Sequence, residues 1–261
     1  LPQVNHPFDV SFFTRYNSEF WDMVEIFESM EIWNGATPFA AGTINAKAFK
    51  KWLSLLDEGK RLTATTGSDT HNIYGDDYFG MTEWLDWLMD IVMKHPEIYP
   101  VHMNENVAYL TWLYNKVWPR LLSWVEQSNT PSTIHNYVYT NGKNQPQEIL
   151  QAIREGHSFI SNGPLVTAEV NGVSYGEKAV LKDRTGTLSV HVFSKKPINH
   201  LWMYTGADKK VELCAKADAA EGGFMYDIAA DELDFGDAAW VLFVADGGEN
   251  NLAISNPILF A

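Results

Sequence analysis

The segment Gly67-Ser68-Asp69-Thr70-His71 places a carboxylate and an imidazole two positions apart, directly after the β-favouring run at 61–67. In an extended chain, side chains at positions i and i+2 point to the same side. Asp69 and His71 can therefore converge on one metal ion or on one reacting atom. Carboxylate and imidazole groups are ligands of zinc, iron and manganese. Because Asp-x-His also occurs in many ordinary loops, the segment alone is consistent with either a metal site or a polar turn.

Two earlier segments also end an apolar run with groups that can bind a metal or a substrate. One is Asn5-His6-Pro7, and the other is Glu31–Gly35, with the sequence EIWNG. Pro7 favours extended backbone at His6 and sets the direction of the turn that follows. Each segment is a weak signal by itself. Together with Gly67–His71 at the end of a third run, they indicate one shared site.

The elements expected to position these segments alternate between strands and helices over residues 1–164. A helix is predicted at about 45–58 from apolar residues at helical spacing, with Gly59 just past its end. A strand is predicted at 132–140 and a short helix at 146–156. This alternation is typical of an α/β sheet or barrel, in which sites lie at the carboxyl edge of the strands.

From about residue 165 the pattern changes to short alternating strands separated by turn signals, which is typical of an antiparallel β-sandwich. Asn171-Gly172 is a hairpin signal within this part. We therefore expect an α/β domain at 1–164 and a β-sandwich domain at 165–261. A Trp-rich helical insertion at about 82–130 interrupts the first domain, and it is expected to form either core helices or a lid over the site.

Composition limits the classes of partner. The chain has 261 residues with a formal net charge of −14 and a pI near 4.9, whereas nucleic-acid binding needs clustered Lys and Arg. No apolar run approaches the roughly 20 residues of a membrane helix. We therefore expect neither a nucleic-acid partner nor a membrane. Cys214 is the only cysteine, so no disulfide can form within the chain.

Taken in order, the motifs NHPF, EIWNG, GKRLTATTGSDTH and REGHSFISNGP resemble those of the PHP (polymerase and histidinol phosphatase) superfamily of metallohydrolases, and within it the CehA/McbA-type proteins. The resemblance spans nearly the whole chain except the 82–130 insertion. GSDTH together with EIWNG is its most specific part. The matching residues are Asn5–Pro7, Glu31–Gly35, Gly59 with Arg61, Gly67–His71, Arg154–Gly156, Phe159, Asn162–Pro164 and Ser255–Ile258.

The resemblance implies the C-terminal part of a distorted (β/α)7 barrel followed by a β-sandwich. It also implies two or three divalent metal ions (zinc, manganese or iron), with His6, Asp69 and His71 among their ligands. A metal-bridging hydroxide would attack a small-molecule phosphate ester, since bound metals lower the pKa of water and stabilise the developing negative charge. Residues expected to contact the substrate or to support the ligands are Glu31, Asn34, Ser68, His157 and Asn162.

The chain departs from the family pattern near its start. Only five residues precede His6 and no HxH motif occurs, whereas the family places an HxH and a bridging Glu well upstream. We therefore expect an incomplete catalytic unit with an open apolar strand edge beside Asp69. A missing N-terminal segment or a homo-oligomer partner would complete it. Relatives with such a sandwich are often exported, so the resemblance favours an exported protein.

Two other functions stay open from the sequence. A different metal-dependent hydrolase, such as an amidohydrolase acting on C–N or carbamate bonds, fits equally well because fold and metals do not fix the bond that is cleaved. A non-catalytic module would instead bind carbohydrate or protein through aromatic residues of the sandwich. The aromatic residues concerned are Trp202, Tyr204, Tyr226 and Trp240.

Two single residues carry alternatives of their own. Glu31 would either orient a ligand imidazole or pair with a nearby Lys or Arg. His157 follows Gly156, at a position where relatives commonly carry Arg or Lys. It would therefore either contact a substrate anion or act as an ordinary hydrogen-bonded histidine.

Overall fold

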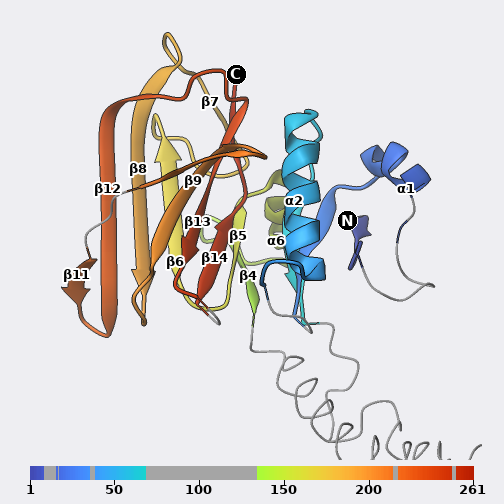
Figure 1. The fold of residues 1–261 in the computed structure, drawn as a ribbon, viewed down its shortest axis with the longest axis horizontal. Helices are drawn as coiled ribbons and strands as arrows, with labels where there is room; N and C mark the ends of the chain where they lie inside the picture. Colours follow the sequence, from blue (N-terminus) through green and yellow to red (C-terminus); the bar gives the residue numbers. More distant parts are fainter. Residues whose placement is uncertain (9–15, 17, 36–38, 69–133, 214–216, 249–250) are drawn as a thin grey trace, which may run out of the picture.

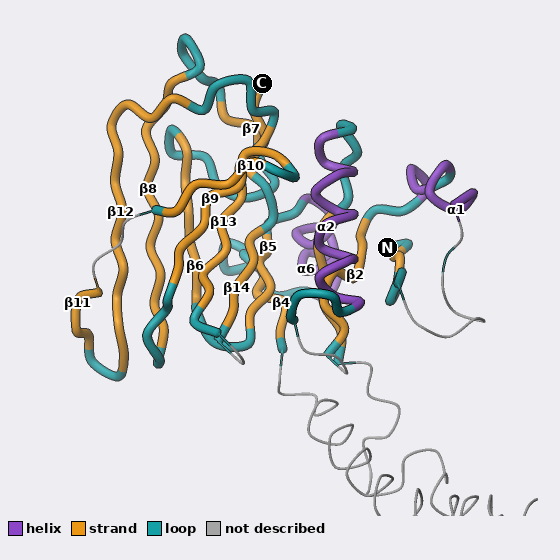
Figure 2. Tube along the Cα trace, viewed as in Figure 1, coloured by secondary structure: helices purple, strands orange, loops and turns teal. Residues whose placement is uncertain are grey.

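The chain folds into three layers, two of which are β-sheets packed face to face (Figure 1). The computed structural model describes residues 1–8, 16, 18–35, 39–68, 134–213, 217–248 and 251–261. These residues are mostly strands. Figure 2 shows the described helices on one side of the molecule and the large sheets on the other.

The first layer is a parallel sheet of three strands in the order β1-β2-β3, with the helices beside it. All six residues of β2 are buried, as is typical of a strand covered on both faces. β1 is the outer strand of this sheet within the described part, and its Val4 side chain is fully buried. The elements of this layer are β1 (Gln3–Val4), α1 (Ser18–Asp22), the short 3₁₀ helix η1 (Val24–Ile26), β2 (Ser29–Asn34), α2 (Ile44–Asp57), β3 (Thr63–Gly67) and α6 (Pro146–Glu155).

Helix α2 forms where the sequence supplies both ends and one apolar face. The Thr43 hydroxyl accepts a main-chain N–H three residues later, at 3.3 Å, and so caps the first turn. Gly59 follows the helix with a φ of 78°, which ends it. On the buried face, Trp52 Nε1–H donates to the Leu62 carbonyl at 2.7 Å. The helix predicted at 45–58 is therefore confirmed.

The middle layer is an eight-stranded sheet that is antiparallel except where β15 pairs with β7. Its main path runs β10-β9-β13-β14-β5-β4, and β15 joins it through β13. Its strands are β4 (His135–Val138), β5 (Ser158–Ser161), β7 (Lys178–Ala179), β9 (His200–Gly206), β10 (Lys209–Glu212), β13 (Trp240–Asp246), β14 (Leu252–Ser255) and β15 (Ile258–Phe260).

The third layer is a four-stranded antiparallel sheet in the order β11-β12-β8-β6. It packs on one face of the middle sheet and forms the sandwich. In β6, exposed and buried residues alternate strictly, because one face meets the core and the other meets solvent. Its strands are β6 (Leu165–Val170), β8 (Thr185–Ser194), β11 (Ala217–Ala220) and β12 (Gly223–Asp234).

The middle sheet separates two hydrophobic cores, as β13 shows. Six of its seven residues are buried, without alternation. Val241 and Phe243 pack with the four-stranded sheet, whereas Trp240 and Leu242 pack with Trp52 and the parallel sheet. The continuous apolar run WVLFVA therefore reflects a strand covered on both faces.

The expected part of a (β/α)7 barrel is wrong, because the described strands form open sheets and no closed barrel. β4 and β5, the next described strands after β3, pair with each other in antiparallel fashion within the middle sheet. They do not extend the parallel sheet. The apolar pattern locates strands correctly, but it carries no information about which edge the following strand joins.

The middle sheet also runs across the expected boundary near residue 165. β4 and β5 precede this position, yet β5 pairs with β14. From Leu165 onward, every helix or strand in the described part is a strand. The insertion expected at 82–130 lies outside the described residues. Among the helices that are described, none has the length and apolar character needed to cross a membrane.

Candidate functional site

The carboxyl ends of the three parallel strands meet at one edge of their sheet. His6 follows β1, Asn34 ends β2, and Ser68 follows β3. The Gly35 N–H donates to the Gly67 carbonyl at 2.7 Å and holds the ends of β2 and β3 together. Parallel pairing thus brings segments that are far apart in the sequence to one edge, which is where sites of α/β sheets form.

Glu31 is a buried carboxylate at this edge, with 6% of its surface exposed. Its Oε2 accepts a hydrogen bond from the main-chain N–H of His6 at 2.6 Å. His6 has a φ of 31°, on the left-handed side that few non-glycine residues adopt, so the extended backbone expected there from Pro7 is wrong. Because a buried carboxylate is costly unless it is hydrogen-bonded, this contact stabilises both partners. Glu31 therefore fixes the main chain at His6.

Two glycines allow the strand ends to approach this closely. A Cβ atom at Gly67 would lie 2.9 Å from Glu31 Oε1, and a Cβ atom at Gly35 would lie 2.9 Å from Ser68 Cα. Both distances are shorter than a carbon atom tolerates. EIWNG therefore ends in a glycine, and GSDTH begins with one, for a steric reason.

Asn34 is held through its main chain by Asn45, the second residue of α2. The Asn45 Oδ1 accepts the Asn34 N–H at 2.8 Å, and the Asn45 amide donates to the Asn34 carbonyl at 3.0 Å. One side-chain amide thus replaces a neighbouring strand at the end of β2. Both residues are buried. The helix–strand connection is therefore anchored directly beside the site.

The free edge of β3 is covered in the same way by two further asparagines. Asn256 accepts the Ala64 N–H at 2.7 Å and donates to the Ala64 carbonyl at 3.2 Å. Asn136 accepts the Thr66 N–H at 3.0 Å and donates to the Thr66 carbonyl at 2.8 Å. These positioning residues were missed from the sequence. The signal was weak, since Asn256 stands out only by its position before Pro257.

The other predicted site residues do not gather at this edge in the described part. Asp69 and His71 lie outside the described residues. His157 lies near the opposite end of β3, since Gly156 is next to Thr63. Asn162 accepts the Leu252 N–H at 2.8 Å and so joins β5 to β14. It therefore holds two neighbouring strands of the middle sheet together.

The donor groups at this edge are of types that bind a divalent metal, but the described residues supply fewer of them than a metal site needs. No group of three or more His, Cys, Asp and Glu side chains that could hold an ion occurs within the described residues. The hydrogen bond between the His6 main-chain N–H and the Glu31 carboxylate brings these two residues, each of a type that can bind a metal, next to each other. Gly67, two residues before Asp69 in the sequence, lies against the same Glu31 carboxylate.

The aromatic residues considered for a binding module are mostly structural. Trp240 is 2% exposed and Tyr226 is 4% exposed. The hydroxyl of Tyr226 accepts the Ile198 N–H at 3.0 Å. Trp202 and Tyr204 are partly buried against the core beneath α2, and the Lys210 ammonium lies 3.9 Å from the centre of the Trp202 ring. No open aromatic platform forms from this set.

Comparison with known proteins identifies no relative. No family model, no curated protein and no solved structure matches the chain. The function is therefore argued from the geometry of the site.

Proposed function

We propose that this chain carries part of the active site of a metal-dependent hydrolase of the PHP type, acting on a phosphate ester, at the carboxyl edge of the parallel sheet. The observation that carries the proposal is the contact between the buried Glu31 carboxylate and the main chain of His6 at 2.6 Å. Gly67 approaches the same carboxylate and continues through Ser68 into Asp69 and His71.

Each residue has a separate task in this proposal. His6, Asp69 and His71 would hold the metal through imidazole and carboxylate donors. Glu31 positions His6 by fixing its main chain, which is the type of support on which ligand geometry depends. Gly67 leaves the space that the Glu31 carboxylate occupies. When bound, the metal would lower the pKa of a water molecule and stabilise negative charge on the phosphate.

The test is metal analysis of the full-length natural protein combined with hydrolysis of bis(p-nitrophenyl) phosphate and p-nitrophenyl phosphate. We expect bound zinc, manganese or iron and release of nitrophenolate from at least one ester. Asp69→Asn should lose the metal, because it removes a carboxylate ligand. Glu31→Gln should weaken metal affinity by about 10- to 100-fold, the usual effect of changing a residue that positions a ligand.

Asp227→Asn is the matched control, since it makes the same carboxylate-to-amide change on the exposed side of the sandwich. It should leave metal content and hydrolysis unchanged. A metal content that Asp69→Asn and Glu31→Gln leave as high as in the wild type would contradict the proposal.

A further inference from the structure

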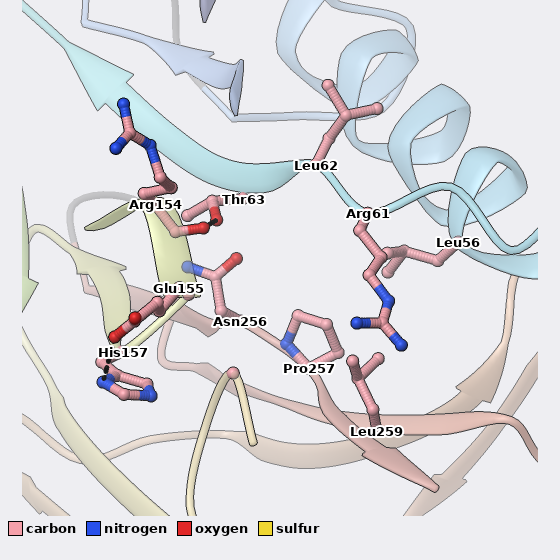
Figure 3. A pocket seen from close by; sticks show the side chains of 12 residues that line it. Leu56, Arg61, Leu62, Thr63, Arg154, Glu155, His157, Asn256, Pro257 and Leu259 are labelled. Atoms are coloured by element: carbon pink, nitrogen blue, oxygen red, sulfur yellow. Dashed lines mark hydrogen bonds and ion pairs between the residues drawn. The ribbon is translucent and has the colours of Figure 1, made fainter. Parts of the chain in front are cut away.

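A cavity of about 370 Å³ lies where the parallel sheet meets the sandwich (Figure 3). Its size is within the range of small-molecule sites, which often occur at such junctions. It is formed by the end of α2, the start of β3, the end of α6, the turn before β7, and β15 with the segment before it. Its lining includes Leu56, Arg61, Leu62, His157, Pro257 and Leu259.

One wall of the cavity is apolar, and the positively charged side chain of Arg61 lies along it. Leu56 and Leu62 are almost fully buried, with 4% and 3% of their surface exposed. Figure 3 shows the Arg61 side chain extending beside Leu56 and Leu259. No hydrogen bond or ion pair joins Arg61 to another residue in the described part of the chain. Its guanidinium is therefore available to a ligand.

The charged groups on the other side already have partners. Arg154 Nε donates to Glu28 Oε2 at 2.8 Å. His157 Nδ1 lies 3.7 Å from Glu155 Oε2, and His157 Nε2 lies 3.9 Å from Glu177 Oε1. The carboxylates near the cavity thus face Arg154 and His157, and Figure 3 shows Glu155 and His157 on the side away from Arg61.

The frame of the cavity is fixed by close main-chain packing. A Cβ atom at Gly176 would lie only 2.0 Å from the Glu155 carbonyl oxygen. The Gly176 N–H donates to the Pro257 carbonyl at 2.8 Å. Asn256, beside Pro257, is tied to Ala64 on β3. These contacts join the sandwich to the parallel sheet around the cavity, so the site is preformed.

We propose that this cavity binds a small organic acid, whose carboxylate pairs with Arg61 and whose apolar body lies against Leu56, Leu62 and Leu259. A guanidinium recognises a carboxylate through two parallel hydrogen bonds, and the apolar wall favours a hydrocarbon body over an inorganic ion. The cavity lies at the amino end of β3, opposite the edge that carries Glu31 and Ser68. This site is therefore separate from the proposed active site and does not depend on it.

The experiment is calorimetric titration of the purified chain with hexanoate, hexan-1-ol and hexylamine. These probes share one hydrocarbon body and differ in charge. Hexanoate should bind saturably and more tightly than both others. Arg61→Gln should weaken hexanoate binding by about tenfold, the usual effect of losing a charged hydrogen-bond donor. Arg61→Lys should keep part of the affinity, because it keeps the charge but loses the planar fork.

Arg184→Gln is the matched control. Arg184 is an exposed arginine that pairs with Asp237 in the sandwich, so the substitution changes the net charge equally but leaves the cavity intact. Its hexanoate affinity should equal that of the wild type. Three results would each overturn the proposal: no saturable binding of hexanoate, equal affinity for hexanoate and hexan-1-ol, or equal affinity in Arg61→Gln and Arg184→Gln.

Discussion

A Cβ atom at position 67 would lie 2.9 Å from Glu31 Oε1. This single contact explains why the GSDTH segment begins with glycine. Glu31 cannot move aside freely, because its other oxygen accepts the His6 N–H. This bond reaches the main chain of His6 and not its ring. In the structure Glu31 holds the main chain at His6, and composition and spacing do not reveal this role.

Gly67→Ala should therefore displace the Glu31 carboxylate. We expect a loss of about 1 kcal/mol in the free energy of unfolding, from the weakened charged hydrogen bond, together with a fall in metal affinity like that of Glu31→Gln. Urea unfolding and metal titration measure the two effects. Gly206→Ala is the control, since a Cβ atom there would make only ordinary contacts of 3.5 Å or more. Equal behaviour of the two variants would refute the steric role of Gly67.

Tyr175 makes the free energy of unfolding depend on pH in the alkaline range. Burial raises the pKa of its hydroxyl well above the ordinary value of 10.0, and the hydroxyl donates to the Val166 carbonyl at 3.0 Å. Above pH 10 the unfolded chain loses this proton while the folded chain keeps it. The contribution to stability is thus complete below pH 10 and is lost as the pH rises through the folded-state pKa.

Tyr175→Phe should remove part of this dependence. We expect a shallower loss of unfolding free energy between neutral and alkaline pH, and a loss of about 1 kcal/mol at neutral pH from the missing hydrogen bond. Urea unfolding at a series of pH values measures both. A slope identical to that of the wild type would show that other groups cause the alkaline loss.

Ser189, His191 and Asp227 form a hydrogen-bonded series on the exposed face of the four-stranded sheet. Ser189 Oγ lies 3.0 Å from His191 Nε2, and His191 Nδ1 lies 2.5 Å from Asp227 Oδ1. This is the spacing of a nucleophile, base and carboxylate. However, β8 lies between β6 and β12, so its main-chain N–H groups are paired and unavailable to an oxyanion.

We therefore expect that a fluorophosphonate will not label Ser189. Mass spectrometry measures the labelling, and stoichiometric labelling of Ser189 would contradict this expectation.

Side-chain amides determine how the secondary-structure elements join. Asn45, Asn136 and Asn256 each bond to both the N–H and the carbonyl of one strand residue, as a neighbouring strand would. Two of them cover the edge of β3, where the parallel sheet ends within the described residues. Asn136 and Asn256 thus join the parallel sheet to the middle sheet through side-chain hydrogen bonds, without strand-to-strand main-chain pairing.

Asn256→Ala should cost more than Asn136→Ala, although each removes the same type of contact. Asn256 is fully buried and also donates to the Ser158 carbonyl, so its loss leaves several buried groups unpaired and should cost about 2–4 kcal/mol. Asn136 is exposed, and water can replace it, so about 1 kcal/mol is expected. Urea unfolding compares them. Equal losses would contradict the importance of burial.

The sequence predicted individual elements well and their assembly poorly. α2 and α6 were predicted because helical spacing and the glycines at 59 and 156 are local signals, and both glycines have positive φ in the structure. The β-favouring run at 61–67 was also a local signal, and β3 lies within it. The barrel was wrong, because the pairing of β4 with β5 depends on contacts that no local pattern records. The run WVLFVA in β13 did carry a signal, since an unbroken apolar strand indicates cover on both faces.

The candidate site could be predicted only in outline. His6, Asn34 and Ser68 were expected at one edge because the ends of parallel strands meet there, whereas His157 and Asn162 were included only through the resemblance. In the structure these two lie elsewhere, beside the cavity and within the sandwich. The asparagines that hold the strands could not be predicted, because a buried asparagine and an exposed one have the same sequence signature.

The molecule as a whole is joined through its middle sheet, which buries one face on each of the other layers. Asp57 at the end of α2 strengthens this junction. Its carboxylate accepts Trp240 Nε1–H at 3.1 Å and the Ala207 N–H at 2.9 Å. Because β4 and β5 belong to the same sheet as β13, we expect the α/β layer and the sandwich to unfold together.

Hydrogen exchange at increasing urea concentrations tests this expectation. Amides of α2 and of β8 should lose protection at the same urea concentration in the wild type. Asp57→Ala should cost about 1–3 kcal/mol from two lost bonds to a charged acceptor and should release α2 before β8. Separate transitions in the wild type would show instead that the layers are independent folding units.

The partner of Ala64 lies 192 residues later in the chain. During synthesis, which proceeds from the amino terminus, β3 is made long before Asn256 leaves the ribosome. The edge of β3 is then without its asparagine, and the groups that Asn256 will bond are exposed to other chains. The order of synthesis therefore creates an interval in which the parallel layer depends on water or chaperones for protection. The interval ends when Asn256 forms its bonds to Ala64.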